Sequence, residues 1–394
     1  MIINNPTKVE KDALSGIMKK DYSKNNTISI NLNKFQERLD NTKFAGATLK
    51  EIIENYFMED VISNKESKQK YNDEIKKFFN EVLKEEENTF VYEFLKKIID
   101  DKKVEYLNLK KYYNRDKVAL KQALHEACKG INNLPDKNTR TPVFASKILG
   151  NPHGLDKKNL SGKIFVMLLS YIEGRKRPKN SEELAELYYK YHLLIDDVSN
   201  MILCKNIIGI KDNGQEHDGM KGFSEANEPL YLTIYNLSNI TSIKNDGKYN
   251  KVMVMENPAV FMEVAEKCKI KDFPMVCTYG QVKLAGIILL DLLVNAGFKI
   301  YYSGDIDPEG MQIADKLKNR YGENLGFFGF DEETYLRNIS DVKISDERLN
   351  KLKTIENLKD ICVNVEKNKK IAYEESNIER IVQFLEEKRL HKKI

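Results

Sequence analysis

Residues 250–330 alternate between short runs of apolar residues and longer segments in which apolar residues recur at helical spacing. The short runs predict buried strands, and the longer segments predict helices. Two of the expected helices begin with proline, which is favoured in the first helical turn. The expected strands are 252–255, 275–278, 298–303 and 325–330, and the expected helices are 258–268, 281–296 and 308–320. This alternation is typical of βαβ units and predicts a parallel sheet with flanking helices.

The chain before this segment has a different pattern, rich in Lys and Glu, with apolar residues at helical spacing. It predicts a mainly helical region, which we interpret as a DNA-binding arm, with a polar, glycine-rich loop at 211–228. The expected organisation is therefore three parts, 1–60, 61–245 and 246–394.

The first of these parts combines strand and helix signals over a short distance. A strand-like run at 27–32 precedes a helix from Lys34, and Thr48 with Glu51 forms a capping box for the next helix. A strand and helices this close together are compatible with a small winged-helix unit.

Acidic residues follow two of the strands expected in 250–330. Glu256 ends the first strand, and Asp305 and Asp307 follow the third. Ligands of such sheets bind beyond the carboxyl ends of the strands, where the strand order reverses. In the order 2-1-3-4 the first and third strands are neighbours, so the three carboxylates would converge. Converging carboxylates repel one another and favour a divalent cation, Mg²⁺ or Mn²⁺, that could orient a phosphodiester.

The roles of the individual side chains at this edge stay open. Glu256 could hold the metal or act as a general base, and Asn257 could position it or begin a turn. Asp305 or Asp307 could instead cap the helix that follows. Glu309 could be a further metal ligand, although a solvated residue of the first helical turn is the favoured interpretation.

Further polar residues are expected near the same edge of the sheet. Thr278, Gly280 and Gln281 follow the second strand and could contact metal or phosphate, although a tight turn explains Gly280 equally well. Glu374 and Glu375 precede a late helix, where a solvated helix start is the favoured interpretation.

Composition narrows the function classes only a little. Charged residues make up 31% of the 394 residues and the net charge is +4, which permits a nucleic-acid partner without requiring one. The basic loop formed by Arg175, Lys176, Arg177 and Lys179 could bind DNA phosphates, or it could simply be solvated.

Cysteine usage and hydropathy bear on the compartment. The five cysteines are scattered and contain no CxxC pair, which argues against a zinc site or a disulfide framework and fits a reducing compartment. The longest apolar run, 284–297, is too short to span a bilayer and contains Asp291. With no apolar signal segment at the start, we expect a cytoplasmic protein without membrane association.

The acidic pattern resembles that of Toprim domains, which have a Glu after the first strand and a DxD motif after the third. Residues 305–310, Asp-Ile-Asp-Pro-Glu-Gly, are similar to the DxDPxG form of the topoisomerase VI A subunit. A closer resemblance, over 255–260, 276–281 and 304–314, is to DUF2399-type C-terminal domains. Further similarity to the usual partner region of these domains covers 12–18, 28–57 and 142–155.

Proteins of this build resemble the JetD family, the nuclease subunits of Wadjet anti-plasmid systems, in their type II branch. The resemblance implies an endonuclease that cuts double-stranded plasmid DNA with Glu256, Asp305 and Asp307 around Mg²⁺. It also implies an SMC-like motor, a kleisin-like subunit and a small accessory subunit as partners. The family has an acidic residue near Glu374, and a homodimer is one assembly that the sequence leaves open.

Two other functions stay open beside the endonuclease. A topoisomerase VI-like transesterase would attack DNA with a tyrosine from a motif that has Arg three residues before a Tyr-Tyr pair. Neither the pair at 188–189 nor the pair at 112–113 has that arginine, so hydrolysis by water is favoured. The third function is a non-catalytic DNA-binding subunit of a motor complex.

Overall fold

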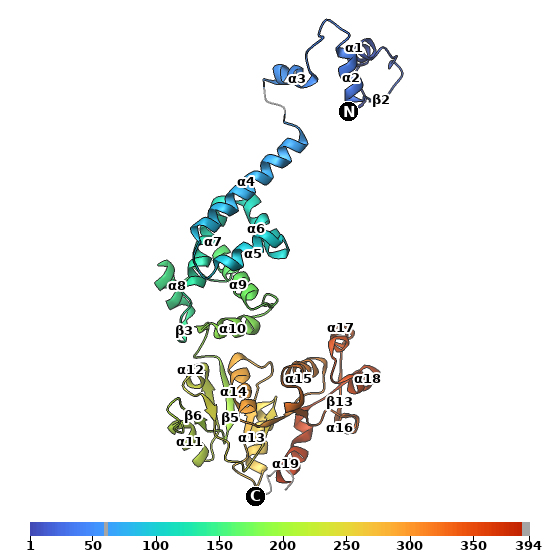
Figure 1. Cartoon of the computed structure of the whole chain (residues 1–394). Helices are drawn as coiled ribbons and strands as arrows, with labels where there is room; N and C mark the ends of the chain where they lie inside the picture. The colour runs from blue at the N-terminus through green and yellow to red at the C-terminus, as the bar shows by residue number, and fades with distance from the viewer. Residues whose placement is uncertain (59–61, 388–394) are drawn as a thin grey trace. The chain divides into compact units, whose positions relative to one another are not determined.

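The computed structural model describes residues 1–58 and 62–387, in two compact units, Met1–Glu85 and Glu86–Ile394 (Figure 1). The protein is mixed α/β and 55% helical. The expected boundary between residues 60 and 61 lies outside the described residues. No helix within the described ranges is both long and apolar enough to cross a membrane.

The first unit joins a two-stranded antiparallel sheet to helices. Its strands and helices are β1 (Ile2–Asn4), α1 (Lys8–Met18), β2 (Thr27–Ser29), α2 (Leu32–Leu39), α3 (Leu49–Phe57) and α4 (Asn64–Glu85). The predicted capping box is present, since Thr48 Oγ1 accepts from Glu51 N at 3.2 Å and Glu51 Oε2 accepts from Thr48 N at 2.8 Å. The winged-helix interpretation of residues 1–60 stays a prediction.

The second unit begins with a helical part whose core lies between α7 and α9. Its helices are α5 (Tyr92–Asp101), α6 (Val104–Arg115), α7 (Lys117–Asn132), α8 (Thr141–Leu149), α9 (Leu160–Ile172) and α10 (Ser181–Lys190). The short strands β3 (Thr139–Arg140) and β4 (Leu193–Leu194) pair in parallel. Leu120, Leu124 and Phe165 are fully buried here, so the helical pattern read from the sequence is confirmed for this part.

A six-stranded sheet organises the C-terminal half in the order β12-β11-β9-β10-β5-β7. The four parallel strands are β9 (Lys251–Met255), β10 (Met275–Cys277), β11 (Lys299–Ser303) and β12 (Leu325–Phe327). In chain order these are strands 4-3-1-2, so the predicted neighbourhood of the first and third strands is confirmed. Ser303 lies beside Met255 in the register, which brings the ends of β11 and β9 level.

Two strands from before residue 246 complete the sheet, and the sequence did not predict them. β5 (Met201–Lys205) pairs antiparallel with β10, and β7 (Leu230–Thr233) pairs antiparallel with β5. Periodicity alone does not separate such short apolar runs from helix segments. The remaining elements between β5 and β9 are β6 (Gly209–Ile210), α11 (Asp218–Glu225), α12 (Ile234–Leu237) and β8 (Ser242–Ile243).

The presence of α11 makes the prediction of a plain loop at 211–228 wrong for part of that segment. His217 Nδ1 accepts from Met220 N at 3.3 Å and caps the helix, while Met220 is buried in the core. A cap and one buried anchor are enough to stabilise a short helix that the polar composition did not reveal.

Helices cover both faces of the sheet. α13 (Pro258–Lys267) and α19 (Ile378–Glu386) pack on one face, with Met253 and Met255 of β9. α14 (Leu284–Asn295) and α15 (Pro308–Tyr321) pack on the other face, with Val252 and Val254. Successive residues of β9 therefore point to opposite helical layers, as a strand buried on both faces requires.

The chain beyond β12 returns to the carboxyl edge of the sheet. Its elements are α16 (Glu332–Asn338), β13 (Ile339–Lys343), α17 (Asp346–Leu349), η2 (Asn350–Thr354), α18 (Lys359–Asn368), β14 (Lys370–Ala372) and η3 (Glu374–Asn377). The short helix η1 (Gly322–Asn324) lies before β12. β14 pairs antiparallel with β13. Ile306 N donates to Ala372 O at 2.8 Å, and this bridge fixes the end of β14 beside the turn that follows β11.

Candidate functional site

Glu256 leaves the end of β9 directly over the neighbouring strand β11. Its backbone N–H donates to Ser303 O at 3.1 Å, and Tyr302, fully buried on β11, donates its hydroxyl to Glu256 Oε2 at 3.3 Å. A Cβ placed on Gly304 would meet Glu256 Oε2 at 2.5 Å. Glycine at position 304 therefore leaves the room that the half-buried carboxylate occupies.

Asp305 and Asp307 follow β11 and flank the buried Ile306. Asp305 Oδ1 accepts from Glu374 N at 2.8 Å. Asp307 Oδ1 accepts from Gly310 N at 2.7 Å, which makes Asp307 the N-cap of α15. The capping role that the sequence left open thus belongs to Asp307, and it uses one of the two oxygens of that carboxylate.

Burial and neighbouring carboxylates shift the ionisation of Glu256 and of Asp305. Burial first, and then the charges of Asp305 and Asp307, raise the pKa of Glu256 to about 7. Burial and the charge of Asp307 also raise the pKa of Asp305, against the hydrogen bond from Glu374 N. Burial contributes most to both shifts and the neighbouring charges contribute less, and the convergence of Glu256, Asp305 and Asp307 stays a prediction.

Glu374 is a fourth acidic residue at this edge, and the interpretation of it as part of a solvated helix start is wrong. Its side chain is fully buried, and its Oε2 accepts from Asn257 N at 2.8 Å. Burial, and then the charges of Glu256 and Asp305, raise the pKa of Glu374 to about 8. Glu375 is exposed, as expected, and accepts from Asn257 Nδ2 at 2.6 Å.

Asn257 connects the start of α13 to Glu374 and Glu375. Its Oδ1 accepts from Ala259 N at 2.8 Å and caps α13, while its backbone and side-chain N–H groups donate to Glu374 and Glu375. The sequence left open whether Asn257 begins a turn or positions Glu256, and its hydrogen bonds go instead to Glu374 and Glu375. The structure assigns it a helix cap and two contacts to acidic residues.

The carboxylate oxygens at this edge are the ligands that a hard divalent cation prefers. Among the described residues they do not form a closed coordination shell. Within residues 1–58 and 62–387, no three His, Cys, Asp or Glu side chains are already gathered as a metal-binding group. Glu374 Oε1 and Ser303 Oγ are buried without a hydrogen-bond partner among the described residues. Carboxylates without a cation repel one another, so each oxygen uses a protein donor where one is available.

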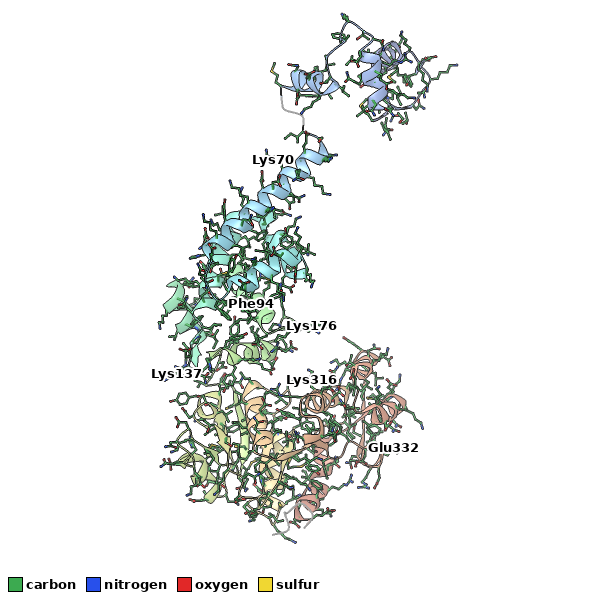
Figure 2. All side chains as sticks on the ribbon, viewed as in Figure 1. Lys70, Phe94, Lys137, Lys176, Lys316 and Glu332 are labelled. Atoms are coloured by element: carbon green, nitrogen blue, oxygen red, sulfur yellow. The ribbon has the colours of Figure 1, made fainter. Side chains whose placement is uncertain are left out.

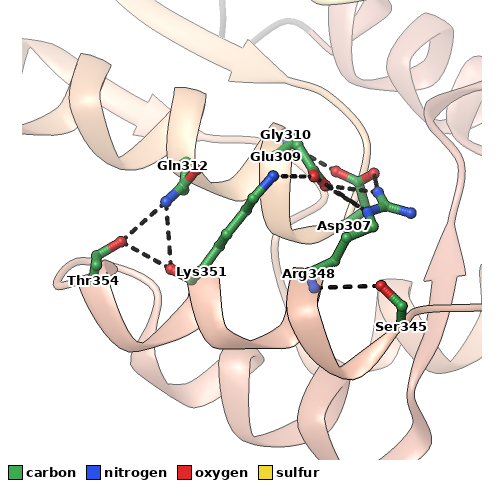
Figure 3. A network of polar contacts seen from close by, with 8 residues as sticks. All are labelled: Asp307, Glu309, Gly310, Gln312, Ser345, Arg348, Lys351 and Thr354. Carbon is green, nitrogen blue, oxygen red and sulfur yellow. Dashed lines mark hydrogen bonds and ion pairs between the residues drawn. The ribbon is translucent and has the colours of Figure 1, made fainter. Parts of the chain in front are cut away.

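Glu309 faces cations rather than the other carboxylates. Arg348 Nε donates to Glu309 Oε2 at 3.0 Å, and Lys351 Nζ donates to Oε1 at 2.6 Å (Figure 3). Burial alone would raise the pKa of Glu309, but the hydrogen bonds from Arg348 and Lys351 outweigh it and lower the pKa to about 2. Arg348 also pairs with Asp307. Glu309 is held in ion pairs, which fits neither of its two interpretations, as an extra metal ligand or as a solvated residue. The sequence analysis did not identify Arg348 or Lys351.

The turn after β10 differs from the expected phosphate-binding helix start. Thr278 is buried, and its N–H donates to Met255 O at 2.9 Å. Gly280 has φ +80° and donates its N–H to Glu256 O at 3.3 Å, as a tight turn requires. Helix α14 begins only at Leu284, and Gln281 is exposed before it. The side chain that does project here is Tyr279, which is 60% exposed.

The basic loop lies between α9 and α10 and lines a cavity of about 1010 Å³ with α5. Phe94 and Lys176, both labelled in Figure 2, are among its lining residues. Lys176 and Lys179 are exposed, Arg175 and Arg177 are half-buried, and Arg177 Nη2 has no hydrogen-bond partner in the described residues. The loop therefore presents cations at an open groove. This groove is formed by other elements than the acidic edge, which we define as the end of the sheet that carries Glu256, Asp305, Asp307 and Glu374.

Two family models match the chain. The N-terminal model DUF3323, described as a protein of unknown function N-terminus, matches residues 2–209, and the C-terminal model DUF2399, described as a protein of unknown function C-terminus, matches residues 230–385. No curated protein matches. The second match contains the four carboxylates and β7, and the first contains the basic loop and β5. Because the first model spans more than half of the chain, the protein belongs to the DUF3323 family and carries a DUF2399-type C-terminal region.

Proposed function

We propose that this protein is a metal-dependent DNA endonuclease that hydrolyses phosphodiester bonds. The observation that carries the proposal is that Glu256 follows β9 and that Asp305 and Asp307 follow β11, two neighbouring parallel strands with level ends, with a raised pKa at Glu256. Acidic groups held this close need a positive charge to remain ionised together. A divalent cation provides that charge, and a phosphodiester supplies further oxygen ligands for it.

Glu256, Asp305 and Asp307 would hold the ion, and Glu374 would lie at its buried side. Mg²⁺ or Mn²⁺ supplies charge stabilisation at the phosphate when it is bound. Asp307 would bind through Oδ2, the oxygen that does not cap α15, in place of its contact with Arg348. Glu256, whose pKa lies near 7, could alternatively accept a proton from the attacking water, because a base is most effective with a pKa near the working pH.

The family matches support a more specific version of this proposal. A DUF3323 region followed by a DUF2399 region is consistent with a JetD-like architecture. We therefore propose a Toprim-type nuclease subunit of a Wadjet-like anti-plasmid complex, acting on double-stranded DNA with an SMC-like motor, a kleisin-like subunit and a small accessory subunit. A homodimer would present two acidic edges, one for each DNA strand.

The direct test incubates closed circular plasmid with the full chain and its partner proteins in Mg²⁺, in Mn²⁺ or in EDTA. Wild-type protein should produce nicked or linear DNA only with metal. Glu256→Gln should abolish cleavage, whereas Glu375→Gln, a matched change of an exposed neighbour, should retain it. Cleavage at the wild-type rate by a folded Glu256→Gln variant would contradict the site assignment.

One observation favours a second function, the tyrosyl transesterase. Tyr188 is buried, so it does not reach DNA, but Tyr279 is exposed in the turn that Gly280 ties to Glu256 O. A tyrosine at φ +60° is uncommon, and such backbone conformations cluster at functional sites. Hydrolysis leaves free DNA ends, whereas transesterification leaves protein joined to DNA. A metal-dependent covalent adduct that disappears in Tyr279→Phe would replace hydrolysis with the second mechanism.

A further inference from the structure

A pair of cations lies against the outer side of the DxD segment. Arg348 comes from α17 and Lys351 from η2, both of which pack on α15. Arg348 Nη2 donates to Glu309 Oε2 at 2.6 Å and also to Asp307, and Lys351 Nζ donates to Glu309 Oε1 (Figure 3). Arg348 therefore contacts Asp307 directly, and both cations are held by Glu309 in the first turn of α15.

The geometry of Arg348 leaves part of its donor capacity unused. Among the described residues, the Arg348 guanidinium forms hydrogen bonds through Nε and Nη2 alone. Its Nη1 therefore donates to none of these residues. The side chain is 32% exposed, and that of Lys351 is 43% exposed. Each can still bind an anion from solvent while it remains attached to Glu309.

The charges of the four side chains balance, with two carboxylates and two cations. A balanced, partly exposed group of this kind contributes little to stability on its own. Its position is informative for another reason, because it attaches two cations beside Asp307, one of the residues proposed to hold a metal. Without these cations, a phosphate beside Asp307 and Glu309 would meet two negative charges.

We propose that Arg348 and Lys351 bind a backbone phosphate of DNA beside Asp307, and that Glu309 positions both cations. This inference rests on the proposed function, because it deepens the same site with a phosphate subsite. Arg is suited to the task, since its planar guanidinium can bind a carboxylate on one edge and an anion on another. Glu309 then acts as a positioning residue rather than as a metal ligand.

The test measures binding of a short labelled DNA duplex to the full chain in EDTA, over a series of salt concentrations. Arg348→Ala and Lys351→Ala should each weaken binding about ten-fold at low salt. Each should also reduce the slope of log affinity against log salt by about one. Lys353→Ala is the matched control, because Lys353 is an exposed residue of the same η2 turn and donates to Asn350; it should change neither quantity.

Thermal unfolding of each variant separates a phosphate contact from a structural role. If Arg348→Ala does not fold, Lys351→Ala decides the question. An unchanged salt slope in folded Lys351→Ala and Arg348→Ala would overturn the inference. EDTA prevents metal-dependent cleavage, so binding and cleavage are measured separately. A salt slope reduced by about one in the variants, together with wild-type protein that does not cleave plasmid, would retain the phosphate subsite and reject the nuclease. An unchanged slope with an active wild-type enzyme would reject the subsite alone.

Discussion

At the scale of single residues, each carboxylate at the acidic edge combines a structural contact with its proposed chemistry. Asp307 caps α15 and pairs with Arg348, Asp305 receives the N–H of Glu374, and Glu256 receives the hydroxyl of Tyr302. Substitutions that remove charge but keep the hydrogen-bond acceptor should therefore separate function from folding.

Asp307 allows this separation to be measured. Asp307→Asn keeps an N-cap oxygen and loses only the partly exposed ion pair with Arg348, so the free energy of unfolding should change little, while metal-dependent cleavage should be lost. DNA binding should be retained or improved, because a negative charge near the phosphates is removed. Asp307→Ala should lose cleavage and also about 1 kcal/mol of stability, the usual effect of removing a cap. Equal stability of the two variants in thermal unfolding would contradict the cap.

Glu374 gives a prediction that is independent of cleavage. It is fully buried beside Glu256 and Asp305, so Glu374→Gln should increase the free energy of unfolding of the metal-free protein by about 1 kcal/mol. Mg²⁺ or Mn²⁺ should raise the melting temperature of the wild-type protein, and less so that of Glu374→Gln. Glu375→Gln is the exposed control. A variant with wild-type stability and an unchanged metal response would remove Glu374 from the site.

At the scale of elements, the sheet depends on connections between distant parts of the chain. β5 supplies an antiparallel neighbour for β10, and β14 brings Glu374 to Asp305. Lys205, at the end of β5, is only 4% exposed and donates Nζ to Lys271 O at 2.7 Å. This buried ammonium joins β5 to the segment before β10.

The ionisation of Lys205 makes the stability of this junction depend on pH. Burial first, and then the charge of Lys271, lower the pKa of Lys205 to about 8 from the ordinary 10.5. Between these values the unfolded chain binds more protons than the folded chain, so stability rises with pH. Relative to Lys205→Met, the wild-type protein should gain about 2 kcal/mol in free energy of unfolding from about pH 7 to about pH 10. A pH-independent difference in urea unfolding would contradict this assignment.

At the scale of the whole molecule, we propose that the acidic edge cleaves DNA and that the basic loop binds its backbone. The loop lines an open groove with α5, whereas the carboxylates follow β9 and β11. Binding through backbone phosphates depends steeply on salt and little on sequence. The two sites can therefore be tested separately.

Neutralising Arg175, Lys176 and Arg177 together should reduce the salt slope of duplex binding by about two to three. The melting temperature should change little, because Lys176 is exposed and Arg175 and Arg177 are only half-buried. An unchanged slope would exclude the loop from the DNA path.

The requirement for partners also belongs to this scale. A nuclease that cut any DNA would damage its own cell, so the isolated chain should cleave linear DNA weakly or not at all, even with Mg²⁺. Adding the proposed motor subunits should produce cleavage of circular plasmid. Rapid degradation of linear DNA by the chain alone, in a time course on gels, would contradict the proposed dependence.

The sequence by itself determined the parallel strands and the placement of Glu256, Asp305 and Asp307 after their carboxyl ends, whereas the strand order was assumed and the structure supplied it. These features are local, because periodicity identifies each strand and the βαβ connection fixes where its carboxyl end lies. The tertiary structure decided what the remaining side chains do. Glu374 reaches the site because the end of β14 is bridged to Ile306, and Arg348 reaches it because α17 packs on α15. No local pattern encodes contacts between residues so far apart in the chain.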